Sequence, residues 1–338
     1  MVRLGTIVVD PPVLNSSCLW ASDIAQLRDL YACPHTGAVT IRTATLHGFK
    51  ENESNAVVFT ADRLSTLNSY GYSPYPLSQY LEWVRELLTS PPPAGGSQSH
   101  AKPVILSITA SKADDLAQMQ VSLIYPLDLA NLIAIELNTS CPNIPSAPPP
   151  CYHLPALRPH LDVLAAAARA DPSLTIGLKL SPYPDVTRIR DVVDCLAEYT
   201  IAEPGSESED ARSPFAFLTC TNTLGGSVLF AGEIDAASAP PSLGADPAPT
   251  AFALPTPLGG IGGERLHALA LGTVLGFSRA LAAHPTPAMR AIKVIGVGGV
   301  KDRASADRMR AAGASAVACA TALGREGLKA FERIAMDA

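Results

Sequence analysis

Eight short apolar runs, spread along almost the whole chain, constrain the fold more than any other feature of the sequence. Each run has the length of a β-strand, and stretches with the apolar spacing of amphipathic helices lie between them. The runs are Pro12–Ser16, Ala38–Arg42, Val104–Thr109, Ala134–Asn138, Ile176–Leu180, Ala216–Cys220, Lys293–Gly296 and Ala316–Ala320. The helix-like stretches include Leu77–Leu88, Leu154–Ala170, Val186–Tyr199, Leu266–Ala283 and Ala304–Ala312. Such alternation is typical of a parallel α/β sheet.

An open, doubly wound sheet would show the same alternation of strands and helices, so this alternation alone does not distinguish it from a barrel. The count of eight and the polar residues at several strand ends favour an α/β fold of the TIM type, a (β/α)8 barrel, and 338 residues suit a barrel with inserted loops. Three segments rich in Pro, Gly, Ser or acidic residues are predicted to be exposed connections: Pro91–Ser99, Glu203–Asp210 and Ala237–Thr250. We therefore expect a single domain over residues 1–338.

Composition excludes several classes of partner. A net charge of −6 and the lack of any basic run argue against nucleic acid or an anionic membrane. No window reaches the roughly 20 apolar residues of a membrane helix, and the first residues lack a signal-peptide core. Seven cysteines without metal-like spacing indicate reduced thiols in a compartment such as the cytoplasm, and no structural metal.

The fourth apolar run leads into Glu136–Asn143, a stretch that carries two amides, two hydroxyls and a thiol. Parallel α/β folds place ligands at the carboxyl ends of their strands. Asn138 and Asn143 can each donate and accept hydrogen bonds, which suits a flat polar ligand. Cys141 lies between them as a possible base or nucleophile. A strand cap followed by a proline loop, with the thiol as small filler, explains the same residues.

Two further strand ends carry unusual residues. Lys179 is bracketed by leucines on a buried run, where an unpaired ammonium would be costly. Gly259–Gly263 precedes a helix and Gly296–Gly299 follows a buried run; such glycine loops let backbone N–H groups approach a phosphate. In a (β/α)8 barrel, the phosphate site lies after the seventh and eighth strands. These clusters indicate a ligand with one phosphate.

The segment Asn138-Thr-Ser-Cys141-Pro-Asn143 resembles the active-site segment of the soluble class 1 dihydroorotate dehydrogenases. Asn68–Gly71, Gly177–Tyr183 and Thr219–Gly225 resemble other segments of that family, and the matches run from about Asn15 to Gly327. The resemblance implies a cytoplasmic, homodimeric oxidoreductase that uses FMN to oxidise (S)-dihydroorotate to orotate in pyrimidine (UMP) biosynthesis. Fumarate would be its electron acceptor.

The resemblance also implies roles for individual residues. Cys141 would be the base, Lys179 would stabilise negative charge on the reduced flavin, and Arg42 would stand in for the family's catalytic lysine. The residues that would hold the substrate are Asn68, Asn138, Asn143, Asn222 and Thr223. The residues that would hold FMN are Ser16, Ser17, Arg42, Thr43, Asn138, Lys179, Gly262, Gly298, Gly299, Ala320 and Thr321. The proline-rich Ile144–Pro150 would form a lid.

Three positions depart from the family pattern. Arg42 replaces a lysine, while Cys18 and Ala320 replace glycines. Arginine is longer and planar, so it is not a neutral exchange at a packed site, although it could pair a carboxylate bidentately. Two alternatives therefore stay open: a related FMN barrel that acts on another unsaturated or cyclic substrate, and an FMN-binding protein without turnover. The thiol and the four asparagines argue against the second.

Overall fold

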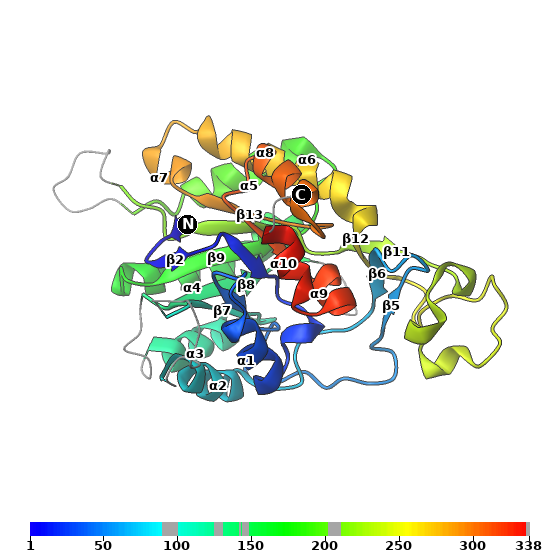
Figure 1. Cartoon of the computed structure of the whole chain (residues 1–338). Helices are drawn as coiled ribbons and strands as arrows, with labels where there is room; N and C mark the ends of the chain where they lie inside the picture. The colour runs from blue at the N-terminus through cyan, green and yellow to red at the C-terminus, as the bar shows by residue number, and fades with distance from the viewer. Residues whose placement is uncertain (90–100, 125–130, 142, 144–148, 202–210, 336–338) are drawn as a thin grey trace.

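Eight parallel strands form one sheet in the computed structural model, which describes residues 1–89, 101–124, 131–141, 143, 149–201 and 211–335 (Figure 1). The strands are β3 (Val13–Asn15), β4 (Val39–Thr40), β7 (Val104–Ile108), β8 (Ile133–Asn138), β9 (Thr175–Leu180), β10 (Phe217–Cys220), β13 (Lys293–Val297) and β14 (Ala316–Cys319). They pair in the order β3-β14-β13-β10-β9-β8-β7-β4, and a parallel bridge between Leu14 and Ala38 joins the two end strands. The predicted (β/α)8 barrel is confirmed, with one strand at each of the eight apolar runs.

Helices follow the barrel strands and cover the outside of the sheet (Figure 1). They are α1 (Ile24–Ala32), α2 (Leu77–Thr89), α3 (Ala113–Ile124), α4 (Leu154–Ala170), α5 (Val186–Ala197), α6 (His267–Ala282), α7 (Pro287–Arg290), α8 (Arg303–Ala311), α9 (Thr321–Glu326) and α10 (Lys329–Ala335). In α5, the buried residues Ile189, Val192, Val193 and Leu196 recur every three or four positions. This spacing gives the helix one apolar face, which packs against the barrel.

A short hairpin closes the amino-terminal end of the barrel. Its strands, β1 (Val2–Leu4) and β2 (Ile7–Val9), pair antiparallel, and Leu4, Ile7 and Val9 are fully buried in one cluster with the strand residues of the barrel interior. Each such side chain contributes roughly 1.5–3 kcal/mol through burial. Because this end is filled with apolar side chains, the polar strand ends face the opposite opening.

A second, antiparallel sheet lies at the other end of the molecule from the hairpin (Figure 1). It contains β5 (Val57–Phe59), β6 (Ser65–Asn68), β11 (Leu224–Ser227) and β12 (Gly259–Gly263), in the order β11-β12-β6-β5. The expectation that Gly259–Gly263 forms a loop was therefore wrong. A Cβ at Gly259 would lie 2.7 Å from the backbone oxygen of Asn68, so glycine allows the two strands to approach.

Residues 228–258, which we call the side lobe, join β11 to β12. The lobe contains three short 3-10 helices, η4 (Ala231–Glu233), η5 (Ala236–Ser238) and η6 (Pro241–Leu243). Its small core packs Leu229, Ile234 and Leu254 against Val58 and Leu67 of the antiparallel sheet. Ala237–Thr250, expected to be an exposed connection, lies in this lobe; the other two expected connections lie outside the described residues, as does most of the expected lid.

All seven cysteines are free thiols, and six of them are buried. Among the described helices, none is long and apolar enough to cross a bilayer.

Candidate active site

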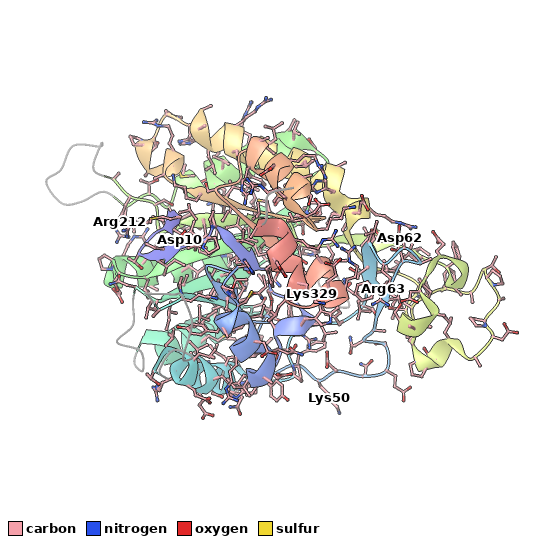
Figure 2. The ribbon with its side chains drawn as sticks, in the orientation of Figure 1. Asp10, Lys50, Asp62, Arg63, Arg212 and Lys329 are labelled. Atoms are coloured by element: carbon pink, nitrogen blue, oxygen red, sulfur yellow. The ribbon has the colours of Figure 1, made fainter. Side chains whose placement is uncertain are left out.

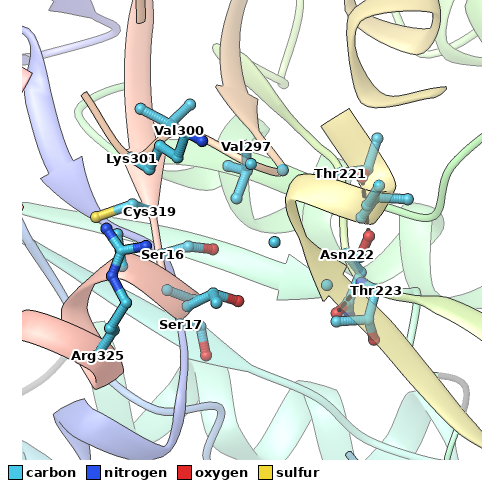
Figure 3. Close-up of a pocket in the computed structure, with 18 of the residues that line it drawn as sticks. Ser16, Ser17, Thr221, Asn222, Thr223, Val297, Val300, Lys301, Cys319 and Arg325 are labelled. Atoms are coloured by element: carbon cyan, nitrogen blue, oxygen red, sulfur yellow. Dashed lines mark hydrogen bonds between the residues drawn. The ribbon is translucent and has the colours of Figure 1, made fainter. Parts of the chain in front are cut away.

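Two adjoining cavities lie where the barrel strands end. The glycine cavity, of about 600 Å³, is lined by Gly262, Gly298, Gly299 and Thr321 among others (Figure 3). The asparagine cavity, of about 400 Å³, is lined by the four predicted asparagines together with Cys141, Arg42 and Thr43. Ser17, Tyr70, Lys179, Asn222 and Thr223 line both cavities. A ligand in one cavity can therefore contact a ligand in the other.

The four asparagines come from separate elements and hold one another in place. Asn143 Nδ2 donates to Asn68 Oδ1 at 2.8 Å, and Asn222 Nδ2 donates to Asn138 Oδ1 at 3.3 Å. Asn138 Nδ2 in turn donates to Thr43 Oγ1 at 2.9 Å. Because these bonds fix which amide atoms face the cavity, the site presents a preformed pattern of donors and acceptors. Such a pattern suits a flat ring with several polar atoms.

The Cys141 thiol is half-buried and lines the asparagine cavity. Burial raises the pKa of this thiol. Four neighbouring groups lower it because they favour the thiolate: the backbone N–H of Asn143, the charge of Lys179, the Tyr72 hydroxyl and the charge of Arg42. Tyr72 lines the same cavity, and burial raises the pKa of its phenol. Once deprotonated, the thiolate of Cys141 can accept a proton from a ligand in the cavity.

Lys179 stands at the junction of the two cavities, at the end of β9. Its side chain is buried, and Nζ donates to Ser16 Oγ at 3.0 Å and to the Ser17 carbonyl at 3.2 Å. Burial lowers its pKa, while the buried carboxylate of Glu136 raises it. Two of its three N–H groups thus have protein acceptors among the described residues, which leaves one for a ligand.

Arg42 is only 3% exposed, and its guanidinium is already engaged. Nη2 donates to Glu51 Oε1 at 2.6 Å and to the Gly71 carbonyl at 3.3 Å. Nη1 donates to Ser22 Oγ at 3.3 Å, and the guanidinium carbon lies 5.4 Å from the centre of the Tyr70 ring. The expectation that this group is free to pair a substrate carboxylate bidentately does not match these contacts.

The glycine cavity has a charged side and a hydroxyl-rich side. Figure 3 shows Lys301 and Arg325 on one side and Thr221–Thr223 on the other. Arg325 pairs with Glu326, and its Nε is buried without a partner among the described residues. Gly298 and Gly299 have φ values of +119° and +73°, and a Cβ at Gly262 would lie 3.2 Å from side-chain atoms of Thr223 and Thr66. These features leave room for a phosphate beside Arg325 and the glycine backbone.

The structure brings together all the residues proposed for the substrate and the cofactor. It also adds three lining residues that the sequence analysis did not assign, Tyr70, Tyr72 and Arg325, and one residue behind the lining, Glu51, which pairs with Arg42. Tyr70 lies inside the segment Asn68–Gly71 already singled out, and Arg325 lies four residues after the expected cofactor residue Thr321, so their positions could have indicated them. Glu51 follows an exposed lysine in an irregular stretch and gave no signal.

Comparison with known proteins gives one family. The family model described as dihydroorotate dehydrogenase matches residues 9–203 and 249–337. The dihydroorotate dehydrogenase (fumarate) of Trypanosoma cruzi is 26% identical over 323 residues, which cover 96% of this chain and 87% of that protein. The enzyme of the same name from Saccharomyces paradoxus is 26% identical over 325 residues, with the same coverage. A putative dihydroorotate dehydrogenase A (fumarate) of Streptococcus agalactiae is 26% identical over 305 residues, covering 89% and 80%.

Proposed function

This chain belongs to the dihydroorotate dehydrogenase family, and we propose that it oxidises (S)-dihydroorotate to orotate in UMP synthesis, with FMN as its cofactor and fumarate as its electron acceptor. The observation that carries the proposal is the thiol of Cys141 among four asparagines, in a cavity that adjoins the glycine cavity. Relatives at 26% identity that are named for the fumarate-dependent reaction support it. The reaction removes two hydrogens from adjacent ring carbons.

Each residue has a distinct task in this proposal. FMN, when bound, supplies the acceptor for the hydride from C6 of the substrate. Cys141 takes the proton from C5, and Asn68, Asn138, Asn143 and Asn222 orient the ring through its amide and carboxylate groups. The expected contribution of a positioned base is about 10² to 10⁴ in rate.

Lys179 places a positive charge at the junction between the two cavities. Thr223 contributes a hydroxyl to both cavities, and Ser16 and Ser17 hold the Lys179 ammonium in position. At the phosphate end, Gly298, Gly299, Ala320 and Thr321 leave room for the FMN phosphate beside Arg325.

Anaerobic mixing with dihydroorotate tests the proposal. The purified protein should carry FMN, and its flavin absorbance should bleach within the dead time of manual mixing and return when fumarate is added. Release of FAD on denaturation, or flavin that stays oxidised with excess dihydroorotate, would contradict it.

A second candidate is oxidation of a related ring that lacks the carboxylate. The contact between Arg42 and Glu51 favours it, because Nη2 of Arg42 already has a carboxylate partner. Bleaching by dihydrouracil but not by dihydroorotate would select this candidate. In that case Arg42→Lys, which restores the residue that the family uses, should confer activity on dihydroorotate.

We further propose that the protein is one FMN-binding barrel domain that works as a homodimer in the cytoplasm. The seven free thiols suit a reducing compartment. Exposed apolar side chains on the side lobe, among them Phe230 and Phe252, offer a surface for a second copy.

A further inference from the structure

Glu51 contacts a residue in the wall of the asparagine cavity from the irregular segment between β4 and β5. Its charged neighbours Lys50 and Glu53 are exposed, and Figure 2 shows Lys50 at the outer edge of the molecule. Glu51 also lies at the surface, but its Oε1 lies 2.6 Å from Arg42 Nη2. The pair joins a buried guanidinium to a carboxylate whose side chain is 34% exposed. Glu51 therefore balances the positive charge of Arg42, which lines the asparagine cavity.

The hydrogen bonds of Arg42 limit what else it can hold. A guanidinium binds a carboxylate through two parallel N–H groups, and each such pair, Nη1 with Nη2 or Nε with Nη2, includes Nη2. Both N–H groups of Nη2 are used, one by Glu51 and one by the Gly71 carbonyl. Nη1 keeps one N–H after its bond to Ser22, and Nε has no partner among the described residues. No bidentate edge of Arg42 is left for a ligand while Glu51 stays in place.

The charged residues of the asparagine cavity also offer little to a ligand carboxylate. Its charged lining residues, in the described part of the chain, are Arg42 and Lys179. Arg42 is balanced by Glu51, and Lys179 interacts with the buried Glu136. The cavity thus presents amides and hydroxyls to the ring but little uncompensated positive charge to a carboxylate.

We propose that Glu51 sets the selectivity of this cavity between ring ligands with and without a carboxylate, by occupying the Arg42 guanidinium. The inference rests on the proposed function, because it assumes that the asparagine cavity binds a dihydroorotate-like ring. Removing the Glu51 side chain frees Arg42 to pair with a ligand carboxylate. A ring without that group gains nothing from the change.

The opposite role, in which Glu51 positions Arg42 for the carboxylate, predicts different results for two substitutions. Glu51→Gln keeps an acceptor for Nη2 and removes only the charge. Glu51→Ala removes both the charge and the acceptor. If Glu51 competes with the ligand, Glu51→Ala, which frees Nη2, binds the anionic ring more tightly, and Glu51→Gln, which keeps Nη2 occupied, gains less. If Glu51 positions Arg42, the alanine variant binds that ring more weakly.

The experiment compares orotate with uracil, which is the same ring without the carboxylate. Dissociation constants for the FMN-loaded protein are measured from the shift in flavin absorbance for wild type, Glu51→Gln, Glu51→Ala and the matched control Glu53→Gln. Orotate should bind about tenfold more tightly to Glu51→Ala, in line with a new hydrogen bond between charged groups, and should gain less in Glu51→Gln, which keeps an acceptor on Nη2. Uracil binding should stay within twofold, and Glu53→Gln should match wild type for both ligands.

Equal changes for orotate and uracil, no change for either, or weaker orotate binding by Glu51→Ala would overturn the inference. Failure of the proposed function looks different: wild type would then neither bind orotate nor bleach with dihydroorotate. Even in that case Glu51→Ala decides the matter, since a gain of orotate binding supports the role of Glu51 and its absence rejects it.

Discussion

Cys141 is the residue whose removal should slow the reaction most, because it is the thiol that faces the four asparagines. Cys141→Ala should keep its FMN but reduce flavin about 10² to 10⁴ times more slowly. Cys141→Ser should recover part of that rate at high pH, since a hydroxyl gives up its proton less readily than a thiol. Stopped-flow measurement of flavin reduction checks both variants. A Cys141→Ala rate within a few-fold of wild type would show that another group is the base.

The pH dependence of reduction should follow the thiolate of Cys141. Burial raises the pKa of this thiol, so only a minor fraction is deprotonated at neutral pH, and the rate should rise with pH until the thiol has titrated. Tyr72 stabilises the thiolate through its hydroxyl. Tyr72→Phe should therefore raise the thiol pKa further and move the midpoint of the rate profile to higher pH, by about one unit for a single hydrogen bond to a charged group.

Alkylation of Cys141 by iodoacetamide, followed by peptide mass spectrometry as a function of pH, measures the same shift without turnover. Tyr75→Phe is the matched control, because Tyr75 is exposed and packs on Trp83 away from the cavity. An unchanged alkylation profile in Tyr72→Phe would rule out this role for the phenol, whatever happens to the rate.

Single residues also show what sequence could and could not indicate about the site. Asn138, Cys141 and Asn143 are close in sequence, so their shared chemistry was readable from one segment. Glu51 and Arg42 are nine residues apart across an irregular stretch, and only the folded chain turns that carboxylate toward the buried guanidinium. Irregular segments have no periodicity that would reveal which side chain points inward.

At the level of elements, helix α9 links the barrel to the phosphate end of the glycine cavity. Thr321 and Arg325 lie four residues apart, hence on one face of the helix, and both line the cavity. Arg325→Gln should weaken binding of FMN about tenfold and leave binding of riboflavin, which lacks the phosphate, unchanged.

Flavin dissociation constants measured with the apoprotein by fluorescence quenching give the result without any turnover. Arg333→Gln is the control, since Arg333 also pairs with Glu326 at 3.0 Å but is 54% exposed and does not line the cavity. Equal loss of FMN and riboflavin binding in Arg325→Gln would mean that Arg325 only supports the structure of the helix.

The elements that were predicted correctly from the sequence have continuous or regularly spaced apolar residues. The barrel strands are buried on both faces, so each reads as a continuous apolar run, and α4 begins and ends at the predicted residues. The antiparallel sheet escaped prediction because β6 is the polar run Ser65–Asn68 and β12 is mostly glycine. Its strands are specified by pairing between segments about 190 residues apart, such as Asn68 with Gly260, which no local pattern contains.

At the scale of the whole molecule, the side lobe lies largely outside the part of the chain that the family model matches. The family model leaves residues 204–248 unmatched, and much of the side lobe falls there. Figure 2 shows Asp62 and Arg63 where the antiparallel sheet meets the lobe, and Arg63 forms an ion pair with Asp235 of the lobe. The lobe is thus tied to the sheet that carries Asn68 and Gly262, so an interface on the lobe would lie close to both cavities.

The exposed apolar residues of the lobe lead to a prediction about assembly. Val228, Phe230, Phe252 and Leu258 are all exposed, and the rings of Phe230 and Phe252 stack with centroids 5.6 Å apart. If this surface is covered by a second copy, Phe252→Glu places a charge in an apolar contact and should convert the dimer to a monomer, as measured by sedimentation velocity at matched concentration. Val186→Glu on α5, which is 65% exposed in wild type, should leave the dimer intact. A wild-type protein that sediments as a monomer, or a Phe252→Glu variant that sediments as a dimer, would exclude the lobe as the dimer interface.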